Sequence, residues 1–329
     1  MIPPMPPVAP QFVPPPIGPV PAEIQRPLWS VMIPTYNCAQ YLRQTLESVL
    51  AQDPGPDQMQ IEVVDDCSTA DNPEAVVRAV AGDRVRFYRK EKNGGAIANF
   101  NTCIERSRGH LVHILHGDDW VAPGFYSAVQ NAHQSHPELS FFHVRSVESD
   151  SQGQPEQLSP RTLFLETPGR NASPLYYSNP LRTPGAVVPR SFYERHGGFI
   201  PCLVHVADWE MWIRAVAEGG GIALNEPLAF YRIHPGNDTG RLVRSAENLR
   251  DYLRLSQCLR NRFPEFNSWT FQRMVLSMAQ NQVLVFGRMG LEEAVHANRC
   301  FIQEMSPWFR LETRARLLCG ALKRACTDP

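Results

Sequence analysis

The chain has 329 residues, of which 43% are hydrophobic and 20% charged, and its formal net charge at pH 7 is -1. This composition excludes a disordered or collagen-like chain and allows one large domain, with or without an appendage. The near-zero charge gives no overall field that would attract nucleic acid, so we expect no nucleic-acid partner. We find no run of 18 apolar residues and no signal-peptide pattern, which predicts a cytoplasmic protein.

The first 27 residues differ in composition from the rest. They contain 11 of the 30 prolines, leaving 19 for the remaining 302 residues. Proline lacks a backbone donor and fixes φ, so such a segment favours extended polyproline II over helices and central strands. We expect residues 1–27 to form a disordered tail outside the fold. The 8 cysteines contain no C-x-x-C pair, which predicts reduced thiols in the cytosol.

From residue 29 onward, short β-branched runs alternate with amphipathic helical stretches. This order predicts an α/β fold with a Rossmann-like, mainly parallel sheet and helices on both of its faces. In such sheets, ligands bind beyond the carboxyl ends of the strands. The expected elements are strands at 30–33, 61–64, 84–88, 110–115 and 139–145, and helices at 42–50, 73–81, 96–106 and 123–136.

The remainder divides into three stretches. Residues 146–180 read as a loop, and residues 184–234 form a second compact stretch with a helix beginning at Asp208. Residues 241–329 predict an all-helical appendage, with helices near 246–262, 268–288, 291–304 and 308–324. The last of these is basic and amphipathic. Such a helix can make peripheral contact with a membrane surface, although packing against the rest of the chain is the favoured interpretation.

Polar residues follow four predicted strands in succession. They are Pro34-Thr35-Tyr36-Asn37, Asp65-Asp66-Cys67-Ser68-Thr69, Asn93-Gly94-Gly95 and His116-Gly117-Asp118-Asp119. Each group alone could be a turn, but four at one edge favour a shared site. The Asp118-Asp119 pair suits a hard cation such as Mg²⁺ or Mn²⁺, held together with phosphate oxygens. Asp65 or Asp66 could accept a hydrogen bond from a nucleobase. No dinucleotide-binding or P-loop glycine motif is present.

These residues carry a family resemblance. The stretches concerned are SVMIPTYN (30–37), EVVDDCSTAD (62–71), NGGAIANFN (93–101), LVHILHGDDWVAPG (111–124), ADWEMWIRA (207–215) and YRIHPGNDT (231–239). Together they resemble the family 2 glycosyltransferases of GT-A fold, over residues 29–239. The resemblance implies a glycosyltransferase domain at 28–240 that transfers a sugar, with inversion, from a nucleotide diphosphate donor to a hydroxyl of a saccharide or lipid-linked acceptor.

The resemblance also implies roles for particular residues. Asp208 matches the catalytic base, and Asp118, Asp119 and His234 match the divalent-cation site. Glu210 and Trp212 would line the acceptor pocket. A carboxylate facing the base favours uracil, hence a UDP-sugar. The residues expected to bind the donor are Pro34, Thr35, Tyr36, Asp65, Asp66, Asn93, Gly94, Asn99, His116, Gly117 and Arg232.

The chain departs from the family pattern at three positions. His116 stands where the metal motif Asp-x-Asp has its first carboxylate, and a neutral imidazole cannot replace that charge. His116 could contact the ribose, ligate the metal or be a polar strand-end residue. Ala207 precedes Asp208 where Glu is usual, and Asp208 could also serve as a helix N-cap. The common Ala-Arg-Asn reads Ala98-Asn99-Phe100 here, without the arginine.

Two other functions compete with this interpretation. A sugar nucleotidyltransferase would also use an α/β sheet and a metal, but it should carry a glycine-rich, basic segment after the first strand, which is absent. A catalytically silent nucleotide-sugar-binding protein is favoured only by His116 and Ala207. The sequence therefore predicts a metal-dependent glycosyltransferase of polysaccharide or glycoconjugate synthesis, in the cytosol or on the cytosolic membrane face.

Overall fold

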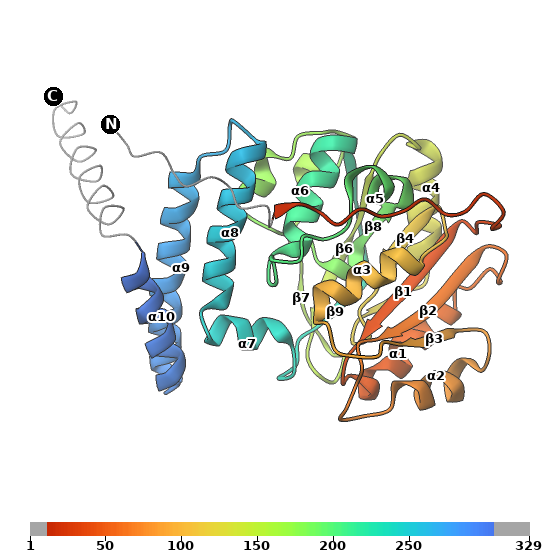
Figure 1. The fold of residues 1–329 in the computed structure, drawn as a ribbon, viewed down its shortest axis with the longest axis horizontal. Coiled ribbons are helices and arrows are strands. Elements are labelled where there is room, and N and C mark those ends of the chain that lie inside the picture. The colour runs from red at the N-terminus through yellow and green to blue at the C-terminus, as the bar shows by residue number, and fades with distance from the viewer. Residues whose placement is uncertain (1–11, 306–329) are drawn as a thin grey trace. The chain divides into compact units, whose positions relative to one another are not determined.

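The structure, a computed structural model, describes residues 12–305. They belong to two compact units, which meet in sequence between Pro235 and Gly236. The first unit is an α/β domain and the second is helical (Figure 1). The predicted fold class, an α/β domain with C-terminal helices, is confirmed.

The first unit is built from alternating strands and helices. Its strands are β1 (Trp29–Thr35), β2 (Met59–Asp65), β3 (Arg86–Arg89), β4 (Leu111–Ile114), β5 (Trp120–Val121), β6 (Phe141–Ser149), β7 (Pro155–Leu158), β8 (Ala186–Pro189) and β9 (Gly221–Arg232). Its helices are α1 (Ala39–Leu50), α2 (Pro73–Ala81), α3 (Ala96–Arg106), α4 (Phe125–Ser135), α5 (Arg190–His196) and α6 (Ala207–Gly219). All five predicted strands are present, and α2 and α3 have the predicted bounds.

The sheet has the strand order β3-β2-β1-β4-β8-β6-β9-β5, and β7 pairs with β6. β1 is parallel to β2 and β4, and β2 is parallel to β3. Because β8 is antiparallel to both β4 and β6, β6 runs in the same direction as β4, and β9 is parallel to β6. Six strands therefore share one direction, which confirms a mainly parallel sheet.

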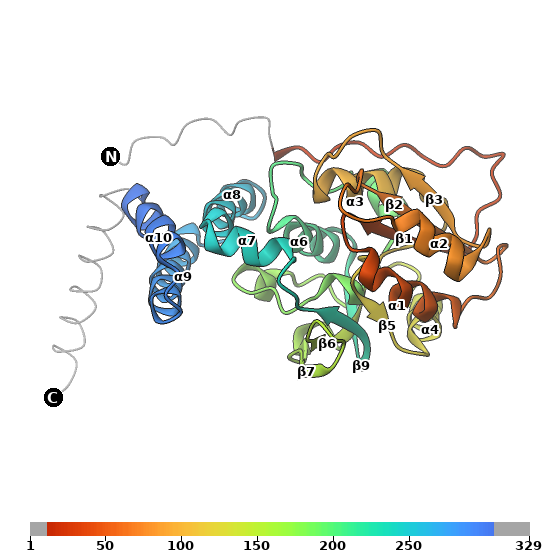
Figure 2. The same ribbon diagram turned by 90° about the horizontal axis from the view of Figure 1, so that it is seen from below.

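Helices cover both faces of this sheet. All seven residues of β1 and of β2 are buried, as expected for central parallel strands. Alternate residues of β1, among them Val31 and Ile33, pack with Leu46 of α1, Val77 of α2 and Val129 of α4. Figure 2 shows α3 on the opposite side of β1 and β2 from α1 and α2.

The stretch from 146 to 234 contains more regular structure than the sequence indicated. β6 continues to Ser149, and β7 and two short 3₁₀ turns lie within the predicted loop. β8 and β9 were not expected as strands. The burial of β9 alternates over its first four residues only, and its register against β6 shifts on either side of Arg145, so the period-2 signal of a strand is interrupted.

Residues 12–27 pack against the first unit. The Pro15 carbonyl accepts a hydrogen bond from the Gly198 backbone N–H at 2.9 Å, and the Gly18 carbonyl accepts one from Arg190 Nη1 at 3.0 Å. Ile17 is buried. The expectation of a tail outside the fold therefore does not hold for this part of it. Proline removes donors but keeps every carbonyl acceptor, and the folded unit supplies the donors.

The second unit contains α7 (Asp238–Arg244), α8 (Glu247–Arg262), α9 (Ser268–Arg288) and α10 (Glu292–Glu304). An ion pair between Arg250 and Glu304 joins α8 to α10. Three predicted helices are confirmed to within one residue of their bounds, whereas the expected helix at 308–324 lies outside the described residues. Within residues 12–305 no helix is both long and apolar enough to cross a bilayer. The six cysteines of this range are free thiols, as predicted.

Candidate active site

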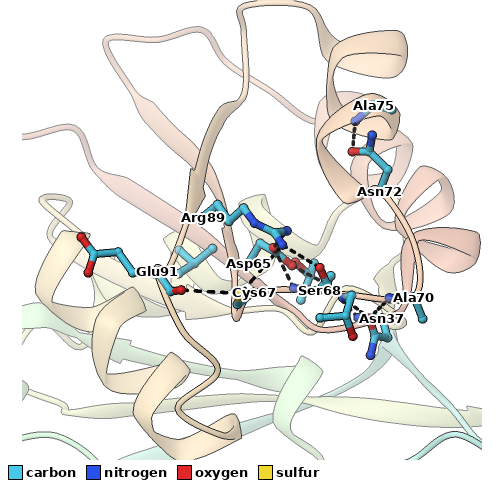
Figure 3. Close-up of polar contacts among 12 residues, drawn as sticks. Asn37, Asp65, Cys67, Ser68, Ala70, Asn72, Ala75, Arg89 and Glu91 are labelled. Atoms are coloured by element: carbon cyan, nitrogen blue, oxygen red, sulfur yellow. Dashed lines mark hydrogen bonds and ion pairs between the residues drawn. The ribbon is translucent and has the colours of Figure 1, made fainter.

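The Asp65 carboxylate organises the loop that follows β2. It is fully buried, and it accepts hydrogen bonds from the backbone N–H and the hydroxyl of Ser68 and from the Arg89 guanidinium at 2.7 Å (Figure 3). Thr35 Oγ1 lies at 3.4 Å. A carboxylate offers about four acceptor sites, so protein donors already saturate Asp65. Asp65 thus holds together the loop after β2, and its contact with a base stays a prediction.

Asp66 is also bound by protein donors. Its oxygens accept hydrogen bonds from Lys90 Nζ and from the backbone N–H groups of Gly94 and Gly95, at 3.0 and 2.8 Å. Asn93 Oδ1 also accepts from the Gly95 N–H, at 3.1 Å. A Cβ on Gly94 would lie 2.8 Å from Lys90 Nζ, so a larger residue would disturb this cluster. Asp66 therefore fixes the Asn93-Gly94-Gly95 loop beside the end of β2.

The loop after β4 packs closely on the loop after β1. The Gly117 N–H donates to the Pro34 carbonyl at 3.1 Å. A Cβ on Gly117 would lie 2.6 Å from Thr35 Cγ2 and 3.0 Å from Cys38 Sγ, so the approach requires glycine. Pro34 and Thr35 are buried, while the Tyr36 side chain is 47% exposed. Of these predicted donor residues, Tyr36 is the one whose ring a ligand can reach.

Asn99 also lies at this edge of the sheet. It is buried on α3, and its amide donates to the Val64 carbonyl at 2.9 Å. The next residue, Phe100, stacks on the His116 imidazole with ring centroids 5.0 Å apart. The aromatic ring that follows Asn99 therefore borders the loop after β4.

His116, Asp118 and Asp119 form a group that could hold a metal ion. One ligand atom from each lies within 4.8 Å of the others, and this is the one such group among residues 12–305. Two buried atoms of the group, His116 Nε2 and Asp119 Oδ2, have no hydrogen-bond partner. Buried polar atoms are normally satisfied, so the orphaned Asp119 Oδ2, which lies 3.6 Å from His116 Nδ1, fits a divalent cation. The two carboxylates of the group suit Mg²⁺ or Mn²⁺.

The pKa values of Asp118 and Asp119 are shifted in opposite directions. Burial, together with the charge of Asp118, raises the pKa of Asp119 well above its ordinary value. Burial acts on Asp118 in the same sense, but its hydrogen bond with His234 and the nearby His116 outweigh it and lower the pKa. His234 Nε2 lies 3.0 Å from Asp118 Oδ2. A bound cation would favour the charged form of both carboxylates.

Arg232 ties this acidic loop to its surroundings. Its backbone N–H donates to Asp119 Oδ1 at 2.9 Å, and its Nε donates to the Asp118 carbonyl at 2.8 Å. The residue is buried. The guanidinium also contacts Gln44, Ser151, Tyr41 and Trp120. Arg232 thus supports the acidic loop through these bonds, and its contact with the donor stays a prediction.

Asp208 contacts the turn that precedes β8, at the same edge of the sheet. Because β8 is antiparallel to β4, with His113 opposite Val187, the residues before Ala186 lie beyond the carboxyl end of β4. These residues include Thr183, whose hydroxyl lies 3.4 Å from Asp208 Oδ2. Asp208 Oδ1 accepts a hydrogen bond from the Trp209 N–H at 2.7 Å.

The surroundings of Asp208 suit a general base. Burial raises its pKa to about 6, against the hydrogen bonds and the positive charge of Arg182. A base with a pKa near the working pH combines availability with proton affinity. The N-cap position of α6 is Val206, so Asp208 is the second residue of the helix and not its cap.

Glu210 and Trp212 lie in the core, which corrects the expectation that they line an acceptor pocket. Both side chains are about 2% exposed. Glu210 pairs with Arg214 at 2.9 Å, and Arg214 also donates to backbone carbonyls, among them that of Gly198 at 2.8 Å. Trp212 packs on Phe141. The helical spacing places them on faces of α6 that are covered by the sheet and by the loop at Gly198.

Four residues at this edge were not singled out from the sequence as parts of the site. They are Tyr41, Gln44, Arg182 and Thr183. Tyr41 lies against His234, with ring centroids 4.6 Å apart. The available signal for Tyr41 and Gln44 was their position in the first turns of the helix after β1. Arg182 and Thr183 carried no local signal, because only the pairing of β8 with β4 brings them to the site.

A family model for glycosyl transferase family 2 matches residues 30–195. An uncharacterised protein of Mycobacterium tuberculosis is 28% identical over 241 residues, which is 70% of this chain and 75% of that protein. The putative teichuronic acid biosynthesis glycosyltransferase TuaG of Bacillus subtilis is 26% identical over 214 residues, covering 63% of this chain and 80% of TuaG.

Two solved structures share the fold. The structure of S. aureus TarS in complex with UDP has a TM-score of 0.52 and 17% identity, covering 85% of this chain and 92% of that chain. The mannosyltransferase PcManGT from Pyrobaculum calidifontis, in complex with GDP-Man and Mn²⁺, has a TM-score of 0.53 and 18% identity. The match covers 95% of this chain and 90% of PcManGT. Identities this low establish similarity of fold alone.

Proposed function

Since the chain belongs to glycosyl transferase family 2, we propose that it transfers a sugar, with inversion, from a nucleoside diphosphate donor to a hydroxyl acceptor, and that it requires a divalent cation. The observation that carries the proposal is the group of His116, Asp118 and Asp119 at the carboxyl edge of the sheet, with the orphaned carboxylate oxygen Asp119 Oδ2. It lies where ligands bind in open α/β sheets. The similarity to TuaG, a putative teichuronic acid biosynthesis glycosyltransferase, supports a role in polysaccharide synthesis. We further propose a saccharide or lipid-linked acceptor.

The acidic group suits the diphosphate end of the donor. We assign His116, Asp118 and Asp119 as the residues that would hold the cation, and His234 as the partner that orients Asp118. A cation bound there would neutralise charge on the leaving diphosphate. Gly117 keeps the loop close to Pro34 and Thr35, and Arg232 holds it from behind. The rest of the loop is therefore fixed before the donor arrives.

The nucleoside end would lie beside Tyr36 and the Asn93-Gly94-Gly95 loop. Because Asp65 and Asp66 are occupied by protein donors, we propose that they shape this region and do not themselves select the base. UDP remains the first nucleotide to test, since the TarS structure contains bound UDP. GDP is the alternative nucleotide to test, since the PcManGT structure contains bound GDP-Man.

Catalysis would depend on Asp208. An ionised carboxylate at this position can accept the proton of the acceptor hydroxyl as that oxygen attacks the anomeric carbon. Its two oxygens are already oriented by the Trp209 N–H and the Thr183 hydroxyl, so the base is positioned before the acceptor binds.

The metal and nucleotide assignments can be tested by calorimetry. We expect Mn²⁺ to strengthen binding of UDP, or of the preferred nucleoside diphosphate, to the wild-type protein. Asp118→Ala should remove most of this gain, on the order of 10-fold or more in affinity, because the site loses a ligand. Asp83→Ala is a matched control, since the Asp83 side chain is fully exposed. Equal Mn²⁺ dependence in wild type and Asp118→Ala would contradict the metal site.

A further inference from the structure

Two buried histidines hold the turn that precedes β8. His113 on β4 places Nε2 3.0 Å from the Pro184 carbonyl oxygen, and His143 on β6 places Nε2 3.3 Å from the Arg182 carbonyl oxygen. Burial lowers the pKa of both imidazoles to about 4, so they are neutral at ordinary pH. Because a carbonyl can only accept, each imidazole must carry its proton on Nε2 and donate it.

The far side of the His113 ring agrees with this tautomer. His113 Nδ1 lies 3.3 Å from the Tyr126 hydroxyl, which can donate to an unprotonated ring nitrogen. His113 is completely buried and stacks on Phe125, with ring centroids 4.7 Å apart. The imidazole is therefore fixed in position and in tautomer, and its bond to Pro184 is a stable anchor.

The turn also presses directly on the sheet. A Cβ on Gly185 would overlap the Val144 carbonyl oxygen and would lie 3.0 Å from His143 Nε2. Backbone cannot move aside as a flexible side chain can, so this position requires glycine. The turn at Thr183–Gly185 is thus clamped between the two histidines and β6.

The clamped turn presents one side chain to Asp208 and carries a cation at the preceding residue. The Thr183 hydroxyl lies 3.4 Å from Asp208 Oδ2, and the positive charge of Arg182 acts on the same carboxylate. Arg182 is itself held by Glu148 of β6, with Nε 2.9 Å from Oε1, and it lies over the Tyr231 ring of β9. A hydrogen-bond donor and a cation both favour the ionised form of a carboxylate, against the effect of its burial.

We propose that residues 182–185 form a positioning element for the base: His113 and His143 clamp the turn so that Thr183 orients Asp208, while Arg182, the residue before it, adds a positive charge to this part of the site. This inference rests on the proposed function of Asp208. The reaction chemistry would still belong to Asp208, and neither histidine would touch substrate.

Few other groups near Asp208 can titrate in the working range. His143 on β6 and His205, in the segment before α6, both have a pKa lowered to about 4 by burial. Glu148 is paired with Arg182, and the phenol of Tyr231 ordinarily ionises near pH 10. At saturating Mn²⁺, which would keep Asp118 and Asp119 ionised, the acid limb of a pH profile should therefore report Asp208.

The test is the pH dependence of kcat/KM for wild type, Thr183→Val and Thr183→Ser. The wild-type profile should fall below about pH 6, the pKa of Asp208. Removing one hydrogen bond to the carboxylate should move this acid limb upward by about 0.5–1 pH unit. Thr183→Ser, which keeps the hydroxyl, should retain the wild-type limb. Thr102→Val on α3 is the matched control, because the Thr102 hydroxyl bonds the Ala98 carbonyl of its own helix.

A second variant keeps the proposal testable if the first one does not fold. Should Thr183→Val fail to fold, Arg182→Gln removes the charge and leaves the turn in place, and it should also move the acid limb upward. An unchanged limb in whichever of these variants folds would overturn the positioning role. If Asp208→Asn itself keeps full activity, the proposed base is wrong; if Asp208→Asn is inactive and the limb does not move, only this inference fails.

Discussion

Asp208→Asn should reduce the turnover number by about 10²–10⁴-fold, the usual contribution of a general base. The amide keeps the shape of the carboxylate, and its oxygen can still accept from the Trp209 N–H or the Thr183 hydroxyl. It cannot take a proton from the acceptor. Donor affinity should stay within about 3-fold of wild type, because Asp208 acts on the acceptor and not on the nucleotide. The measurement is release of nucleoside diphosphate, with donor binding followed by calorimetry.

The control for this substitution is Asp57→Asn, which makes the same chemical change at an exposed position of the same unit. It should leave turnover unchanged. Loss of donor binding in Asp208→Asn would assign the residue to the donor site and not to the acceptor. Turnover equal to wild type would remove Asp208 from the mechanism.

Arg214→Ala should lower the free energy of unfolding of the first unit by about 3–5 kcal/mol. The Arg214 side chain is completely buried and pairs with Glu210, which is 2% exposed. Its guanidinium also donates to the carbonyls of His196, Gly197 and Gly198. Removing it leaves a buried carboxylate and three carbonyls without their donor. The midpoint of thermal unfolding should fall by on the order of 10 °C.

A second ion pair of the same spacing provides the comparison. Arg43 and Glu47 on α1 are also four residues apart, but their side chains are 59% and 58% exposed. Exposed pairs contribute about 0–1 kcal/mol, so Arg43→Ala should change the unfolding midpoint by only about 1–2 °C. A similar fall in the unfolding midpoint for Arg214→Ala and Arg43→Ala would contradict a stabilising role for the buried Arg214–Glu210 pair.

The sequence was informative where a feature is local. Asn72 caps α2 by accepting from the Ala75 N–H at 3.1 Å, and Pro73 follows at its first position, so this helix began where capping rules place it. Helix periodicity also placed α3 and α9. The four polar groups at strand ends came together because parallel strands direct their carboxyl ends to one edge. The acidic group of Asp118 and Asp119 was visible for that reason.

The features that were missed depend on long-range pairing. Nothing near Asp65 in the sequence indicates that Arg89, 24 residues later, would occupy its carboxylate. Glu210 stands four residues before Arg214 on the same helix, so their pairing is local, but the loop at Gly198 that helps to bury Arg214 is distant in sequence. Thr183 reaches Asp208 only because β8 enters the sheet antiparallel to β4. Such contacts are set by the assembled sheet and not by local propensity.

The most direct test of the proposed function is to identify the nucleotide product. Purified protein is incubated with Mn²⁺, a panel of UDP-, GDP- and other nucleotide sugars, and saccharide or lipid-linked acceptors. We predict release of a nucleoside diphosphate from at least one donor, dependent on the cation and lost in Asp208→Asn. Formation of pyrophosphate would indicate a nucleotidyltransferase. Binding of a nucleotide sugar without turnover of any donor would contradict an active glycosyltransferase and favour a binding protein.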